Sequence, residues 1–330
     1  MRAGAGAGTE SAGGRGGGFL TSTAGVVTLA LVATFLWGSA FPCIKIGYRL
    51  FSIPADDTAS QMLFAGVRFV LAGLGVILAA SLARRRPLVA RRADWRCVLV
   101  LSLFQTTLQY ALFYLGLGHA SGVTSSIIEA TNTFFCILIA SLAFRLERLT
   151  ARKLAGCAVG FAGVALVTLS QGSGGLSFSL AGEGAVLAST VAAAMSSSLI
   201  QVFSREGHDP VTLSGWQFLV GGLTLAVIGL AAGGTLAPSG PASVALLLYL
   251  AFISAAAYSL WSLLLANNPV SRVSVFGFCN PVFGAILSTL LLGEGGLVSP
   301  AVLLCSLALA SAGIVIVNTQ RPAARTSEAR

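Results

Sequence analysis

Three ionisable residues, Lys45, Arg68 and Glu129, lie within long apolar stretches of the sequence. A charge is costly inside a lipid bilayer, so such residues usually face the interior of a helix bundle or a water-filled cavity. Arg68 or Lys45 could bind a carboxylate, and Glu129 could bind an amine. Burial raises the pKa of a carboxyl group, which would also suit Glu129 to taking up and releasing a proton. A structural alternative stays open, in which a permanent Arg68–Glu129 ion pair only fixes helix packing.

Uncharged polar and aromatic residues in the same stretches form a second set. Buried amides either bridge helices or contact a ligand, and Trp37 lies too deep for an interfacial aromatic belt. Ordinary packing is the alternative for each of them. The candidate substrate-binding residues are Trp37, Lys45, Arg68, Gln109, Tyr110, Glu129, Asn132, Tyr258, Trp261 and Asn280, and Glu129 is also the candidate for proton coupling.

Two prolines, Pro42 and Pro281, also lie within these stretches, and Asn280 directly precedes the second. Proline lacks a backbone N–H donor, so each is expected to interrupt its helix and to free a carbonyl group. Such breaks can mark hinges or ligand contacts. The alternative is a kink that serves only the shape of the helix.

The residue types that enzymes and metal sites need are scarce. The six cysteines and two histidines show no metal-ligand spacing. The sequence has no GxxxxGK[ST], HExxH or GxSxG motif, so neither ATP hydrolysis nor common hydrolase chemistry is indicated. We therefore expect no catalytic residue, no metal and no cofactor, and a protein that is not an enzyme.

The composition identifies the medium around these residues. Of the 330 residues, 55% are hydrophobic and only 9% are charged, and the mean hydropathy is +0.87. Soluble domains have roughly 25% charged residues. A soluble chain this apolar would expose large hydrophobic patches, so the excess must face lipid.

The apolar stretches have the length of membrane-spanning helices, which is about 20 residues. They are too long and too continuous for the strands of a β-barrel. The sequence therefore predicts an all-α integral membrane protein with about ten transmembrane helices. These lie near residues 24–46, 61–83, 96–117, 122–144, 153–170, 182–203, 211–232, 243–265, 271–292 and 299–318.

Charge sets the predicted orientation. The net charge of +9 does not indicate nucleic-acid binding, because the basic residues lie in short segments between apolar runs. Cytoplasmic loops of membrane proteins are rich in Lys and Arg, which places both termini in the cytoplasm. The abundance of Gly, Ala and Arg favours a bacterial source, and hence the inner membrane. The two basic clusters are Arg84, Arg85, Arg86, Arg91, Arg92 and Arg96, and Arg145, Arg148, Arg152 and Lys153.

The two halves of the chain resemble each other. Tyr110 aligns with Tyr258, and RFVLAG (68–73) aligns with QFLVGG (217–222). Each half has five helices, an odd number, so the second is inverted relative to the first. Inverted repeats place a substrate site between the halves near mid-membrane. The alternative is a gene duplication whose two halves serve only as a structural scaffold. The expected segments are a flexible cytoplasmic tail (1–22), the first repeat (23–172), the second repeat (180–319) and a cytoplasmic tail (320–330).

Several motifs resemble those of a known family. FLWGSAFPCIKIG (35–47) looks like the first helix of the drug/metabolite transporter superfamily, in its two-repeat EamA-type branch. FRLERLTARKLAGCAVGFAGVAL (144–166) and LLLGEGGLVSP (290–300) are similar to the ends of that family's repeats. The resemblance covers about residues 24–318 and implies ten helices, cytoplasmic termini, a central cavity and ATP-independent transport of small metabolites. One departure is VAAAMSSSL in the sixth helix, which lacks the Trp-Gly pair of the first.

The sequence thus predicts a secondary active transporter, with an exporter of amino acids or related compounds as the first hypothesis. An importer or exchanger is the alternative within transport, and a membrane-embedded enzyme or a channel is the alternative of another class. The expected partners are a small-molecule substrate, the lipid bilayer and a proton or counter-substrate, but no nucleic acid. Gly156 and Gly160 permit close helix contact, within a monomer or at a homodimer surface.

Overall fold

The computed structural model of the chain describes residues 14–117, 119, 125, 128–170, 179–292 and 299–319. Every regular element within these ranges is a helix. Among the described residues, nine helices are long and apolar enough to cross a membrane, and Ile128–Ala143 is a shorter apolar helix. These ten segments fall on the ten predicted spans, so the predicted all-α fold of about ten helices is confirmed.

The first half contains the first five spans, several of which consist of consecutive helical pieces. They are α1 (Gly14–Thr21) and α2 (Thr23–Leu50), α3 (Thr58–Arg84), α4 (Asp94–Leu101) with the π-helix η1 (Ser102–Leu108) and α5 (Gln109–Leu117), α7 (Asn132–Leu138) with the π-helix η2 (Ile139–Ala143), and α8 (Ala151–Ser170).

The second half contains the remaining five spans. They are the π-helix η3 (Leu180–Gly184) with α9 (Ala185–Arg205), α10 (Pro210–Ala231), α11 (Pro241–Asn267), α12 (Val270–Ser274) with the 3₁₀-helix η4 (Val275–Phe278) and α13 (Cys279–Leu292), and α14 (Pro300–Asn318). Polar caps begin several of these helices. For example, Asp209 accepts a hydrogen bond from the Thr212 N–H and precedes Pro210, a combination that suits a helix start.

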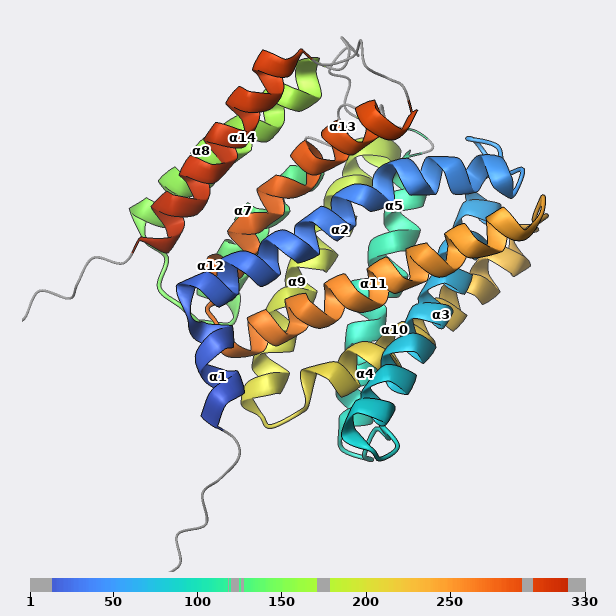
Figure 1. The fold of residues 1–330 in the computed structure, drawn as a ribbon, viewed down its shortest axis with the longest axis horizontal. Coiled ribbons are helices and arrows are strands. Elements are labelled where there is room, and N and C mark those ends of the chain that lie inside the picture. Colours follow the sequence, from blue (N-terminus) through green and yellow to red (C-terminus); the bar gives the residue numbers. More distant parts are fainter. Residues whose placement is uncertain are drawn as a thin grey trace, which may run out of the picture.

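The two halves pack against each other through equivalent pairs of helices. The second helices of the halves, α3 and α10, form an extensive contact at one edge of the bundle, and α8 packs along α14 at the opposite edge (Figure 1). Helix α2 packs against α11 and α13, and its counterpart α9 packs against α5 and α7. The contacts of α2 are thus repeated by those of α9, whereas α3–α10 and α8–α14 each pair equivalent helices, as an inverted repeat requires.

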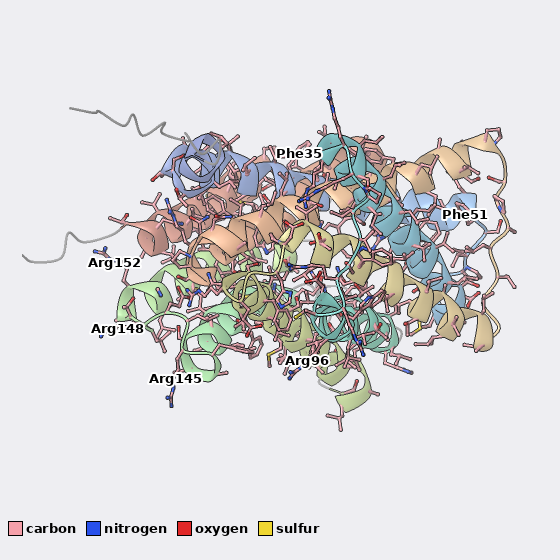
Figure 2. All side chains as sticks on the ribbon, turned by 90° about the horizontal axis from the view of Figure 1, so that it is seen from below. Phe35, Phe51, Arg96, Arg145, Arg148 and Arg152 are labelled. Carbon is pink, nitrogen blue, oxygen red and sulfur yellow. The ribbon has the colours of Figure 1, made fainter. Side chains whose placement is uncertain are left out.

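Both ends of the described chain lie at the same end of the bundle, here called the proximal end. Thr23 and Thr319 line one shallow apolar groove there, and α1 lies on the same side as the end of α14 (Figure 1). Arg145, Arg148 and Arg152 lie together at this end, and Phe51 lies at the opposite, distal end (Figure 2). The arginine cluster thus marks the proximal end.

Small residues allow α8 and α14 to approach closely. A Cβ atom on Gly156 would lie 2.9 Å from the Gly313 carbonyl oxygen, and one on Gly313 would lie 2.6 Å from that of Gly156. Gly160 faces the ring of Phe278. The predicted close contact at these glycines therefore lies within the bundle.

Two local expectations need correction. Residues 14–21, expected to belong to the flexible tail, form α1, because Asn268 and Arg272 donate hydrogen bonds to the Leu20 and Thr21 carbonyls. Pro42 does not interrupt its helix: α2 continues from Thr23 to Leu50 because neighbouring helices pack on both of its sides.

The break in the ninth span was predicted next to Asn280, and it lies there. The span changes at η4 from α12 to α13, and Pro281 occupies the first turn of α13. A proline at that position needs no N–H partner.

Candidate binding cavity

A cavity of about 480 Å³ lies between the two halves. This volume falls in the range of roughly 300–1,000 Å³ that is typical of small-molecule sites. All ten candidate residues line it: Trp37, Lys45, Arg68, Gln109, Tyr110, Glu129, Asn132, Tyr258, Trp261 and Asn280. The structure therefore brings together every residue that the sequence singled out for binding.

The cavity occupies the middle and the distal part of the bundle. Its lining includes Lys45, Thr168 and Thr289, near the distal ends of α2, α8 and α13. In the other direction it extends to Trp261 and Ser274, which lie a few residues from the proximal ends of α11 and α12. A molecule in this cavity would contact both halves at mid-depth.

Arg68 is the most enclosed charge in the cavity. Its side chain is buried, and its guanidinium carbon lies 4.5 Å from the ring centre of Phe69 and 5.7 Å from that of Tyr110. Such cation–π contacts hold a guanidinium group without neutralising it. The buried Nε atom of Arg68 has no hydrogen-bond partner, so the group retains a donor for an anion.

Glu129 and Lys45 complete the charged set. Glu129 is half-buried and Lys45 is exposed at the distal end of the cavity. No N–O contact within 4.0 Å joins Arg68 to Glu129, both of which the structure describes. The permanent ion pair between them, which the sequence left open, is not present in this conformation.

The three charges all come from the first half. The position equivalent to Arg68 is Gln217, which is fully buried and accepts a hydrogen bond from Thr106 at 2.8 Å. The position equivalent to Glu129 is about Phe276, also buried. Neither residue lines the cavity. The cavity is thus lined by both halves, but its charged residues come from the first half alone.

Aromatic rings form one wall. The ring of Trp37 lies 4.9 Å from that of Tyr258 and 5.0 Å from that of Trp261, both nearly perpendicular to it. This edge-to-face geometry is favourable for aromatic pairs. Trp37 therefore links α2 of the first half to α11 of the second.

Beside this wall, four rings form what we call the axial cluster: Phe69, Tyr110, Phe218 and Tyr258. Phe69 stacks on Phe218 with ring centres 5.2 Å apart, and the hydroxyl oxygens of Tyr110 and Tyr258 lie 3.0 Å apart. Each phenylalanine also contacts the tyrosine of its own half, at 4.6 Å and 4.9 Å. Both cross-half pairs join equivalent positions of the repeat, so the cluster lies on the axis that relates the halves.

Several buried polar atoms in the lining have no hydrogen-bond partner among the residues that the structure describes. Buried polar groups in proteins are nearly always hydrogen-bonded, so a group of exceptions around one space indicates that water or a ligand supplies the partners. The unpartnered atoms are Trp37 Nε1, Arg68 Nε, Gln105 Oε1, Ser274 Oγ and Asn280 Oδ1.

The sequence analysis missed a set of hydroxyl residues. Helix α9 contributes Ser189, Thr190, Ser196 and Ser197 to the lining. Their spacing places them on one face of a helix, and that periodicity could have identified them. Burying a hydroxyl group costs much less desolvation free energy than burying a charge. Hydropathy alone therefore does not distinguish these four residues from the apolar residues around them.

Hydrogen bonds between the halves, and within the second half, close the proximal end. Gln201 donates from Nε2 to the carbonyls of Leu265 (3.2 Å) and Asn268, and Ser214 donates to Ser262 at 2.9 Å. Between the halves, the Glu147 carboxylate accepts bonds from the Ser271 backbone and hydroxyl groups. These contacts lie between the cavity and the proximal surface.

Ion pairs add to this closure. Arg84 pairs with Asp209 at 2.8 Å, and His208 lies 2.6 Å from Asp94. Both pairs connect the first half to the loop between α9 and α10. The ion pairs formed between two described residues all lie at the proximal end.

Known proteins share this sequence pattern and fold. The sequence profile of the EamA-like transporter family matches residues 24–169 and again residues 180–319. A solved crystal structure superposes with a TM-score of 0.70 at 18% identity, covering 89% of this chain and 97% of that one. That likeness confirms the fold.

Curated relatives come from bacteria, archaea and a plant. An uncharacterized transporter of Synechocystis is 27% identical over 81% of this chain and 82% of its own. A probable terminal-alkyne amino-acid exporter of Streptantibioticus cattleyicolor is 27% identical over 91% of this chain and 95% of its own. The chain spans 64% of a WAT1-related chloroplast protein of Arabidopsis thaliana, at 26% identity.

The two profile matches together cover most of the chain, and each coincides with one five-helix half of the fold. The predicted resemblance to the EamA-type branch is confirmed, and the alternative of a membrane enzyme is set aside. The chain is a multi-pass membrane transporter and belongs to the EamA-like transporter family.

Proposed function

We propose that the chain is a secondary carrier that exports a small amino acid or a related zwitterion by alternating access. The observation that carries this proposal is the single cavity in which Lys45, Arg68 and Glu129 meet without an ion pair between Arg68 and Glu129. Charged side chains within membrane spans usually face the bundle interior or a water-filled cavity and mark pathways for substrates or ions.

The charges suggest how the substrate is oriented. A carboxylate between Arg68 and Lys45 gains charge-assisted hydrogen bonds from both cations. An ammonium group at Glu129 balances the remaining charge, and the Trp37, Tyr258 and Trp261 rings cover an apolar side chain. With two cations facing one anion, the site favours a substrate that has at least one carboxylate.

The arginine-rich proximal end is the cytoplasmic end under the positive-inside rule, so the cavity of this conformation would extend toward the outside. The proposed direction, export, is supported by the relative named as an exporter of an amino acid. In the bacterial plasma membrane, this conformation would be the one that releases substrate.

Glu129 is also the proposed coupling residue. An export cycle without ATP needs a second gradient, and a carboxylate that binds either substrate amine or a proton couples the two by competition. A counter-substrate in place of the proton would make the protein an exchanger, and reversed flux would make it an importer. Both alternatives are outcomes of the test that follows.

The test measures transport by the purified chain in proteoliposomes, with a panel of radiolabelled amino acids and an imposed pH gradient. We expect proton-dependent flux of at least one zwitterion, and a large reduction of that flux at low substrate concentration in Arg68→Gln and Glu129→Gln. The control is Arg96→Gln, which removes a positive charge from an exposed side chain that points away from the bundle (Figure 2). Normal flux in both cavity variants would overturn the proposed site.

A further inference from the structure

Three potential metal ligands from distant parts of the chain meet at the proximal end. Cys97 lies on α4 of the first half, and Glu206 and His208 lie in the loop between α9 and α10 of the second half. One ligand atom of each residue lies within 4.8 Å of those of the other two. We propose that these side chains form a binding site for Zn²⁺ or a similar transition-metal ion that joins the two halves.

The donor set suits this class of ion. Thiolate, imidazole and carboxylate together are typical zinc ligands, at distances of about 2.0–2.3 Å, and a fourth position is often left to water. Calcium and magnesium prefer oxygen ligands alone. Tetrahedral coordination needs donor atoms about 3.3–3.8 Å apart, so the three side chains would have to close by about 1 Å.

Asp94 holds the His208 ring in the orientation that metal coordination needs. Its Oδ1 atom lies 2.6 Å from His208 Nδ1, and its Oδ2 atom accepts the Arg91 backbone N–H at 2.7 Å. Metal-bound histidines commonly donate their second N–H to such a carboxylate. With Nδ1 engaged by Asp94, Nε2 is the nitrogen left to bind the ion.

The local backbone presents these ligands together. Glu206 caps the end of α9, and Gly207 has a φ of +90° with open space around its Cβ position. The His208 backbone N–H bonds back to the Phe203 carbonyl of α9 at 3.0 Å, and its side chain reaches Asp94 on α4. Cys97 is buried and Glu206 is exposed, so an ion would reach the thiol from the aqueous surface.

Binding would have a mechanical consequence. The Cys97 thiol would lose its proton to solvent as the metal–sulfur bond forms, and the ion would then connect α4 directly to the α9–α10 loop. These are the elements that must separate if the proximal end is to open. A bound ion would therefore hold the closed proximal end and inhibit transport.

The test uses the full chain without a polyhistidine tag, in detergent, titrated with Zn²⁺ by calorimetry and with Co²⁺ by absorption spectroscopy. We expect one ion per chain and a thiolate-to-cobalt charge-transfer band. Asp94→Asn should weaken Zn²⁺ binding by about 10–100-fold, and Cys97→Ser, Glu206→Gln and His208→Gln should weaken it at least as much. Glu206→Gln alters an exposed residue, so it tests the site even if Cys97→Ser fails to fold.

Matched controls are Cys305→Ser and His119→Gln, which alter an exposed cysteine and an exposed histidine elsewhere in the chain. Both should bind as the unaltered chain does. The proposal is overturned if the unaltered chain binds no stoichiometric ion, or if the ligand variants bind as tightly as the controls. Binding is measured without transport, so this outcome does not depend on the proposed function.

Discussion

The hydroxyl groups of Tyr110 and Tyr258 share a hydrogen bond of 3.0 Å, although 148 residues separate them in the chain. They occupy equivalent positions of the two repeats, so each tyrosine contacts its own counterpart. A contact of this kind lies on the axis between the halves. If the halves rock against each other in transport, residues on that axis move least.

Replacing either tyrosine with phenylalanine should break this hydrogen bond between the two halves. We expect Tyr110→Phe and Tyr258→Phe each to lower the free energy of unfolding by roughly 0.5–1.5 kcal/mol. The double variant should cost little more than either single one, because both remove the same bond. Thermal unfolding in detergent measures this, and strictly additive losses would contradict the pairing.

Two substitutions of Arg68 should separate the contribution of its charge to substrate binding from that of its planar geometry. Arg68→Gln removes the charge and should reduce the affinity for a carboxylate substrate about tenfold or more. Arg68→Lys keeps the charge but loses the planar donor group and the stacking on Phe69, so it should restore only part of the affinity. Substrate-concentration curves in proteoliposomes measure both, and an unchanged half-saturation constant in Arg68→Gln would exclude a direct contact.

The glycines of α8 and α14 should be sensitive to a single methyl group. Gly156→Ala would place a Cβ atom 2.6 Å from Val317 and 2.9 Å from the Gly313 carbonyl. We expect a loss of about 1–3 kcal/mol in the free energy of unfolding.

The matched control for this change is Gly75→Ala, where nothing lies within 4 Å of the new Cβ atom. That variant should be neutral or more stable by up to about 1 kcal/mol, because alanine favours a helix. Equal unfolding temperatures for the two alanine variants would argue against the close approach of α8 and α14.

The Arg84–Asp209 pair should make a small, pH-dependent contribution to stability. Burial alone would raise the pKa of Asp209, but hydrogen bonds from Arg84 and Thr212 outweigh it and hold that pKa below its ordinary value. A lowered carboxyl pKa stabilises the fold above the ordinary value and loses this effect as the pH falls through the folded-state pKa. Both side chains are about one-third exposed, so we expect at most about 1 kcal/mol.

Asp209→Asn tests this contribution, because asparagine can still cap α10. At neutral pH the variant should unfold slightly more easily than the unaltered chain. The difference should begin to shrink as the pH falls below the ordinary Asp pKa of about 3.9 and should disappear once the pH is below the lowered folded-state pKa of Asp209. A difference that persists in acid would indicate that capping, and not the charge, is what Asp209 supplies.

Much of the fold and the cavity could be predicted from the sequence because the membrane leaves few alternatives. A polar residue in an apolar span must face inward, which selects Arg68, Glu129 and Asn132 without any knowledge of tertiary structure. The repeat alignment also identified Tyr110 and Tyr258 as equivalent. Lipid therefore makes hydropathy and periodicity more informative here than in a soluble protein.

Other features could not be predicted, because they depend on contacts between distant residues. The bond between Asp94 and His208 joins positions 114 residues apart, and neither residue lies in a recognisable motif. The π-helical turn at η1 changes the direction of Gln105 relative to α5, which no simple periodicity describes. The hydroxyl groups of α9 were missed because a serine in a helix can donate its hydrogen bond to a nearby backbone carbonyl, as Ser196 does to Ala193. Such a serine needs no polar partner on another helix.

The one-sided placement of Lys45, Arg68 and Glu129 has a thermodynamic consequence. If the bundle opens at its other end in transport, the positions equivalent to Arg68 and Glu129 carry the uncharged Gln217 and Phe276, which do not line the cavity described here. The half-saturation constants measured from the two sides of the membrane should then differ. Over a full cycle, however, differences in affinity cancel, so unequal halves cannot drive net accumulation, and the free energy for it must come from a gradient dissipated through the same cavity.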